Sequence, residues 1–410
     1  MRCLVALMGG YFIITTLLSL TVNPWRINKT PFEIDALDSS REISGTVRVG
    51  KAALANKGNW QTVILGSSRM EIGFNPEHPV FADTKTVNLA MSAANILETV
   101  PAGNYVLDRN PGIKTLILGI DAGDLHNDLD SRKYNTRFFN SPFADNNISI
   151  ERSINQLIGG RSLVDSIATI QRHLSGKQPD RSHLGQWINP NYPGNLRAYV
   201  ESTFKMGFEP SRDAWNLRSQ TLRQGKADLL SGFIKRVREE GIRMYIIIPP
   251  QHALKQIHPE LNAPTTVCWE KDLLELREIC TKANSVNSQA PPVELWSFLH
   301  FNEYTTRKMP SGNAGIQRME GWFDLGHAQD ALGDLILNNL FSREAGADPN
   351  TPTVGINLTS TDWDSFRNEW IAAHSIYCGN NPEDVAWWRS HMNQAADSGI
   401  STRVMDEDAN

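Results

Sequence analysis

Cysteine, clustered basic residues and long apolar runs are all scarce in this sequence. The four cysteines, Cys3, Cys268, Cys280 and Cys378, form no Cys-x-x-Cys pair and no cysteine–histidine spacing typical of zinc. We therefore expect buried or unreactive thiols, with no metal and no other cofactor. Lysine and arginine are dispersed, and the net charge is −5 over 410 residues, which argues against nucleic acid as a partner.

Only one segment, residues 3–22, stays apolar and uncharged for about the twenty residues that a membrane-spanning helix needs. Trp25 and Arg26 follow it, as residues at a membrane interface would. No small-x-small cleavage signal precedes Asn23 and Pro24, which favours a retained signal anchor in residues 1–24 over a cleaved signal peptide. We predict a single-pass protein of the inner (cytoplasmic) membrane with its bulk on the extracytoplasmic side, periplasmic or extracellular.

Residues 25–58 are predicted to form a juxtamembrane linker helix. Ile43, Val47 and Leu54 recur at near-helical spacing, and basic residues stand between them. These basic side chains could touch lipid headgroups, but a solvated helix face is the simpler expectation. They are Arg41, Arg48, Lys51 and Lys57.

From residue 59 onwards the pattern is that of an α/β protein. Short apolar runs end at turn residues, and helical patterns such as 229–237 and 332–340 stand between or after them. Runs of this kind suit strands of a parallel sheet that is buried on both faces, so we expect a doubly wound, three-layer α/β/α fold. The predicted strands are 62–65, 86–89, 115–118, 244–248 and 293–298.

Two segments interrupt this alternation, which otherwise spans a domain of residues 59–342. Residues 128–225 are polar with weak helical patches, and we predict a mainly helical insertion that covers or walls the site. Residues 343–410 are predicted to be a polar helical tail. Its tryptophans are expected to pack helices onto the body rather than to stack on sugars.

The most informative motif is a serine after a strand, paired with an aspartate and a histidine near the end of the domain. Ser67 and Ser68 follow the run 62–65 and Gly66, while Asp324 and His327 lie three residues apart. A serine becomes a nucleophile when an imidazole takes its proton and a carboxylate orients that imidazole. In open α/β sheets such groups meet at the carboxyl ends of the strands.

These blocks resemble the SGNH (GDSL-like) hydrolase superfamily, in particular a membrane-anchored bacterial branch with Gly-Ser-Ser-Arg in place of Gly-Asp-Ser-Leu. Val63 to Arg69 is similar to the first family block, which makes Ser68 the nucleophile. Asp324 to His327 is similar to the last block, Asp-x-x-His, which holds the other two members of a catalytic triad. The resemblance implies an SGNH or flavodoxin-like fold.

The middle blocks depart from the family pattern. Ala93, in the stretch 88–93, stands where an oxyanion-hole glycine is usual, and its backbone N–H could still donate. Asp121, in 119–121, stands where an asparagine is usual. An ionised aspartate cannot donate a hydrogen bond to an oxyanion and would repel it.

Three further positions have two interpretations each. Arg69 either binds a substrate carboxylate or phosphate, or pairs with Asp121 or Asp124. His252 follows the fourth predicted strand, either as a substrate contact or as a surface-loop histidine. Asp121, Asp124 and His126 could be metal ligands, but their loose spacing does not favour a metal.

The resemblance implies a serine esterase or O-acyltransferase acting on O-acyl esters, with acetyl groups on cell-envelope or exported glycans as the expected substrates. Its catalytic residues would be Ser68, Asp324 and His327. The alternative is a non-catalytic binding or scaffold module of an envelope polysaccharide or export complex. The third class, a metal-dependent hydrolase, would use Asp121 and His126.

Overall fold

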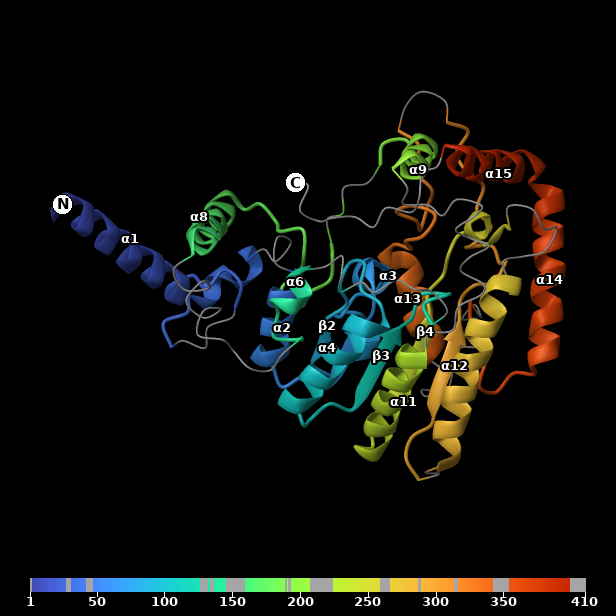
Figure 1. Ribbon diagram of the computed structural model, residues 1–410, viewed down its shortest axis with the longest axis horizontal. Coiled ribbons are helices and arrows are strands. Elements are labelled where there is room, and N and C mark those ends of the chain that lie inside the picture. Colours follow the sequence, from blue (N-terminus) through green and yellow to red (C-terminus); the bar gives the residue numbers. More distant parts are fainter. Residues whose placement is uncertain are drawn as a thin grey trace.

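A six-stranded, mostly parallel sheet forms the centre of the protein (Figure 1). The computed structural model describes residues 2–26, 31–41, 47–125, 132, 136–144, 159–188, 190, 193–206, 224–258, 266–286, 289–312, 316–341 and 354–398. The strand order is β2-β1-β3-β4-β5-β6. The strands are β1 (Thr62–Leu65), β2 (Thr86–Asn88), β3 (Thr115–Gly119), β4 (Arg243–Ile248), β5 (Val293–Ser297) and β6 (Ile356–Asn357).

The five strands expected from the sequence are all present, and they pair with one another in parallel. Their apolar side chains are buried, as the uninterrupted apolar runs predict for a sheet covered on both faces. The expectation of a wholly parallel sheet is wrong at one edge. The two-residue strand β6 comes from the predicted tail and runs antiparallel to β5, so the sheet is mixed.

Helices cover both faces of the sheet (Figure 1). On one face α4 (Ile96–Arg109), α11 (Gln224–Glu239) and α12 (Thr266–Val286) pack side by side. On the other face α3 (Ser68–Gly73) packs against α13 (Asp330–Phe341). This second contact is backbone on backbone, because a Cβ atom at Gly333 would lie 1.5 Å from the Gly73 carbonyl oxygen. The close approach requires glycine at position 333.

The N-terminal part of the chain extends away from the sheet (Figure 1). The apolar segment forms α1 (Arg2–Thr21), which packs against α8 (Gly160–Ser175) of the predicted insertion. Helix α8 also contacts the short helix η1 (Asp35–Ser40). Within the described ranges we find no helix whose length and hydropathy would let it cross a bilayer.

The linker segment contains α2 (Val47–Lys57), but its basic face is not solvated. Arg48 and Lys51 are 1% and 0% exposed. Arg48 pairs with Glu98 at 2.7 Å, and Lys51 with Glu71 at 3.2 Å. The expected solvent or lipid contact is wrong for these two residues, because acidic partners distant in sequence neutralise them inside the protein.

The insertion and the tail both contain helices within the described residues. The insertion contributes α6 (Thr136–Phe139), α8 and α9 (Leu196–Lys205), and the tail contributes α14 (Trp363–Asn380) and α15 (Pro382–Asp397). Helices α9 and α15 pack together through Phe204 and Trp388, whose ring centroids lie 5.0 Å apart. Trp370 and Trp388 are buried, which agrees with the expected packing role of the tail tryptophans.

Two short 3-10 helices complete the connections around the sheet. They are η3 (Pro79–Phe81), which leads into β2, and η4 (Ala253–Gln256), which follows β4. Helix η4 lies close to α15. The loop between β4 and η4 emerges at the carboxyl end of the sheet, where the candidate site lies.

Candidate active site

The turn between β1 and α3 presents Ser68 at the carboxyl end of the sheet. Gly66 opens this turn with φ +143°, and a Cβ atom there would lie 2.5 Å from Met70 Cγ. Only glycine accepts this conformation and this contact. Ser67 caps α3, because its Oγ accepts a hydrogen bond from Arg69 N at 3.3 Å. Ser68 is therefore the first residue of the helix, with a half-buried side chain.

A second loop brings the histidine and the aspartate to the same place. It is closed as a narrow hairpin, because Phe323 N donates to His327 O at 2.9 Å and Trp322 bridges Ala328. Inside the hairpin, Asp324 Oδ1 accepts from the backbone N–H groups of Gly326 (2.7 Å) and His327 (2.9 Å). The Asp-x-x-His spacing thus folds into a turn that the aspartate itself stabilises.

Ser68, His327 and Asp324 form a continuous hydrogen-bonded relay. Ser68 Oγ lies 2.8 Å from His327 Nε2, although the two residues are 259 positions apart. His327 Nδ1 lies 2.9 Å from both Asp324 carboxylate oxygens. Burial by itself would raise the pKa of Asp324. The His327 ring, Lys255 and the Gly326 backbone N–H group outweigh burial and hold the pKa of Asp324 well below its usual range. The carboxylate is therefore ionised and can orient the imidazole.

Arg69 fastens the nucleophile helix to this hairpin. Its Nε donates to Gly326 O at 2.9 Å, and its Nη1 pairs with Asp121 Oδ2 at 2.5 Å. Asp121 Oδ1 accepts from Ser67 Oγ at 3.0 Å. Of the two interpretations of Arg69, the structure shows the ion pair with Asp121. The negative charge of Asp121 is consequently neutralised beside the serine.

The remaining oxyanion candidate, Ala93, lies beyond the end of β2 beside the nucleophile turn. Leu89 N donates to Ile64 O (2.8 Å) and Met91 N donates to Gly66 O (2.9 Å), so this segment runs along β1 and its turn. Ala93 is exposed and has φ +56°. Among the described residues, the backbone N–H groups of Ser68 and Ala93 have no acceptor. They are the available donors for an oxyanion at this edge.

His252 is neither a surface residue nor oriented towards an open site. The side chain is fully buried, its Nε2 lies 2.7 Å from Arg307 O, and its Nδ1 accepts from Leu254 N at 3.2 Å. Burial lowers the pKa of His252 to about 4, against a smaller opposing effect of its hydrogen bond to Arg307. Its own backbone N donates to Leu325 O at 2.9 Å. His252 thus supports the Asp324–His327 hairpin from behind.

The alternative metal set does not come together in the described part of the chain. Asp124 is buried and pairs with Lys226 at 2.8 Å, and its other oxygen accepts from Ile96 N at 2.9 Å at the start of α4. His126 lies outside the described residues. Over the described ranges, no group of three metal-ligating side chains is found.

Several residues near the relay carried no motif in the sequence. Lys255, on η4, helps to lower the pKa of Asp324. Phe323 sits edge-on to the His327 ring at 6.0 Å between centroids, and Tyr199 of α9 sits edge-on to Phe323 at 6.2 Å. The insertion therefore reaches the site through α9, whereas α8 packs against α1. Only the position of Phe323 next to Asp324 could have suggested any of these contacts.

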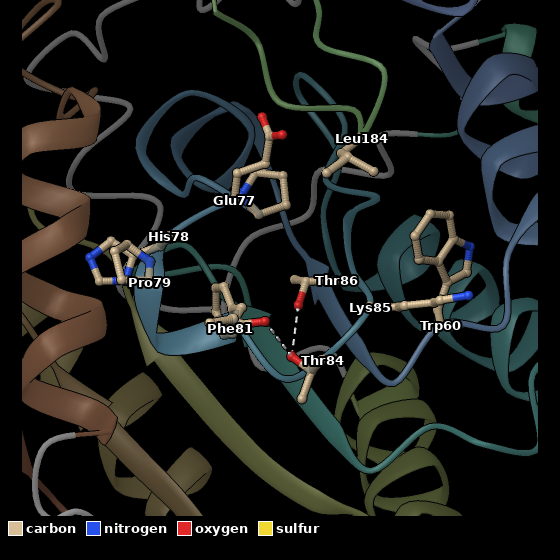
Figure 2. A pocket seen from close by; sticks show the side chains of 11 residues that line it. Trp60, Glu77, His78, Pro79, Phe81, Thr84, Lys85, Thr86 and Leu184 are labelled. Carbon is tan, nitrogen blue, oxygen red and sulfur yellow. Dashed lines mark hydrogen bonds between the residues drawn. The ribbon is translucent and has the colours of Figure 1, made fainter.

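A separate hollow of about 310 Å³ lies at the β2 edge of the sheet, lined by residues of η3, of the turn before β2 and by Leu184. Figure 2 shows Thr84 between Phe81 and Thr86, with its Oγ1 hydrogen-bonded to Phe81 O at 3.2 Å and 3.2 Å from Thr86 Oγ1. It contains no residue of the Ser68 relay. The hollow is therefore distinct from the candidate active site.

No protein-family model, no curated protein and no solved structure matches this chain.

Proposed function

We propose that this protein is a serine acyl-hydrolase or O-acyltransferase with an SGNH-like fold. One observation carries the proposal: Ser68 Oγ, His327 Nε2 and the Asp324 carboxylate form an unbroken chain of 2.8 and 2.9 Å contacts. Such a chain is the arrangement that activates a serine for acyl transfer. Its position at the carboxyl end of a mostly parallel sheet is where such folds bind ligands.

In the proposed reaction, His327 Nε2 accepts the Ser68 proton while Ser68 Oγ forms a bond to the ester carbonyl carbon. Asp324 stabilises the imidazolium through Nδ1. The carbonyl oxygen becomes an oxyanion, and the tetrahedral centre collapses when His327 returns the proton to the departing alcohol. The acyl group is then carried by Ser68.

The second half of the reaction reverses the roles. His327 takes a proton from a second hydroxyl, whose oxygen attacks the acyl carbon. His327 then returns the proton to Ser68 Oγ as the acyl–serine bond breaks. If that hydroxyl belongs to water the protein is an esterase, and if it belongs to another alcohol it is an O-acyltransferase. The N–H groups of Ser68 and Ala93 would bind the oxyanion in both halves. The pairing of Asp121 with Arg69 keeps an uncompensated carboxylate away from that oxyanion.

The substrate class follows from the resemblance and from the predicted anchor. Acetyl esters on cell-envelope or exported glycans remain our proposal, together with a single-pass location in the inner membrane and an extracytoplasmic catalytic domain. These parts of the proposal depend on analogy rather than on a side chain that recognises a sugar.

The proposal is tested with the purified full chain, a fluorophosphonate probe and p-nitrophenyl acetate. We expect labelling and turnover in the unchanged protein, and loss of both in Ser68→Ala. The matched control is Ser360→Ala, which removes an exposed serine hydroxyl after β6 and should change neither. A folded protein without labelling or turnover would refute the enzyme and favour the non-catalytic binding module. Chelator-sensitive turnover in Ser68→Ala would instead indicate a metal-dependent hydrolase.

A further inference from the structure

A buried charged cluster lies directly beneath the proposed active site. Its centre is Glu71, on α3 one turn after Ser68, with a side chain that is 0% exposed. Glu71 Oε1 accepts from Arg181 Nε at 2.7 Å and lies 3.2 Å from Lys51 Nζ. Glu71 Oε2 accepts from Ser92 Oγ at 2.9 Å. The nucleophile helix is thereby joined to the turn that contains Ala93.

The turn at Ser92 and Ala93 is held from two sides. The Ser92 hydroxyl donates to Glu71, and the Ser92 carbonyl oxygen accepts from Arg48 Nη2 at 2.9 Å. Arg48 is itself fixed by Glu98, whose Oε2 accepts from Arg48 Nε at 2.7 Å. Both hydrogen bonds are made to Ser92, the residue immediately before Ala93.

These hydrogen bonds matter for Ala93 because its backbone is in the left-handed region, which residues other than glycine disfavour. With φ +56°, its Cβ atom crowds the backbone, and a free alanine would relax to a negative φ. Relaxation would turn its N–H group away from its present direction. A strained conformation of this kind persists only where the surroundings over-determine it, and such places are often functional.

A buried charged cluster contributes little net stability to the fold. Removing charges from water carries a large penalty, and apolar side chains often stabilise a core as well as buried ion pairs do. The charged groups of this cluster instead fix the orientation of the turn at Ser92. Arg48 and Glu71 reach Ser92 from different elements, α2 and α3, and each ends in a defined hydrogen bond.

We infer that Glu71 and Arg48 are positioning residues, which act through Ser92 to direct the Ala93 N–H towards the oxyanion. This inference rests on the function proposed above. The Ala93 N–H would then be a second fixed donor beside the Ser68 N–H, in a site where Asp121 stands at the position of the usual asparagine. Oxyanion donors contribute only when they lie at about 2.7–3.1 Å from the developing charge, so control of this turn controls the rate.

The experiment removes the hydroxyl that connects Glu71 to the turn. Ser92→Ala should lower kcat for p-nitrophenyl acetate by about tenfold to a hundredfold, less than the 10²–10³ that loss of a whole donor costs. KM should stay within about twofold, because the donor acts on the transition state and not on the bound ester. Ser92→Thr keeps a hydroxyl and should restore most of the rate.

The matched control is Ser141→Ala, which removes a buried serine hydrogen bond, to Phe138 O at 2.7 Å, in a segment outside the site. It should leave kcat unchanged. A kcat for Ser92→Ala equal to that of the unchanged protein, or a loss that Ser92→Thr does not restore, would overturn the inference while the proposed function stands. Absence of turnover in the unchanged protein would instead remove the proposed function, and the inference with it.

A double variant adds an independent check on the path through Glu71. If the Ser92 hydroxyl acts through Glu71, then Glu71→Gln and Ser92→Ala should lower kcat together by no more than the larger single effect. Multiplicative effects would show that the two residues act separately and would refute the linkage. If Glu71→Gln does not fold, because Lys51 and Arg181 lose their partner, the Ser92 series decides the inference alone.

Discussion

Replacing Asp324 by asparagine should separate the catalytic role of the hairpin from its folding. Asp324 Oδ1 accepts two backbone N–H groups, from Gly326 and His327, and both Oδ1 and Oδ2 lie 2.9 Å from His327 Nδ1. An asparagine would therefore place its carbonyl oxygen at the Oδ1 position and its NH2 group at the Oδ2 position. The turn would keep its backbone hydrogen bonds, and the change would be confined to the imidazole.

The NH2 group would then lie about where Oδ2 now lies, 2.9 Å from His327 Nδ1. Two donors cannot share that contact, and the amide oxygen at the Oδ1 position would already use its two lone pairs on the Gly326 and His327 N–H groups. Nδ1 would therefore lose its proton and the ring would carry it on Nε2. Ser68 would then face a donor instead of a base. In serine hydrolases that use this relay, such a change lowers kcat about 10⁴-fold, which is about 5 kcal/mol of transition-state stabilisation.

The assay compares kcat for p-nitrophenyl acetate, the fluorophosphonate labelling rate and the melting temperature. Asp362→Asn is the matched control, because Asp362 Oδ1 also accepts a backbone N–H, from Ser365 at 2.8 Å, at the start of α14. Both variants should melt close to the unchanged protein, and only Asp324→Asn should lose its rate. A fall in kcat of less than about tenfold in Asp324→Asn would refute the tautomer argument.

Three further variants test the surroundings of the relay. Asp121→Asn should reduce kcat at least severalfold in the same turnover assay. Both Asp121 oxygens already bond Ser67 and Arg69, so the new amide would not reach the oxyanion. A rise in kcat of about 10² would show that the amide does donate to the oxyanion. The free energy of unfolding should decrease as the pH is lowered from 4.5 to about 2. Burial raises the pKa of Glu71, but its basic neighbours lower it to about 2, so the unfolded chain binds more protons there. Urea titrations of Glu71→Gln should show a weaker pH dependence. Gly66→Ala should cost about 1–3 kcal/mol in the same titrations, because its methyl group would meet the α3 methionine, and unchanged stability would contradict the described turn.

Local patterns in the chain were sufficient to predict the sheet and the relay. The apolar run before Gly66 favours a buried strand, and the Asp-x-x-His spacing is short enough for one turn, so both could be predicted without knowledge of any distant contact. The edge strand β6 was missed, because two residues have no periodicity to detect. The helical insertion was predicted, but its division between α9 at the site and α8 against α1 was not.

The charged residues show where prediction from the sequence ends. The pattern around Arg48 and Lys51 indicated a solvated face, and the alternatives for Arg69 and His252 stayed open, because each depends on its partner. Glu98, Glu71, Asp121 and Arg307 lie far away in the chain. A linear pattern shows which residues carry charge but not which charges meet.

What the amino-acid sequence determined by itself was therefore the set of local elements and the three chemical groups at their ends. Tertiary structure alone decided that Asp121 is neutralised by Arg69, that His252 is buried behind the hairpin, and that Glu71 reaches Ser92. The physical reason is the same in each case. The energy of a buried polar group depends on the partner that replaces water, and that partner is brought to it only when the whole chain folds.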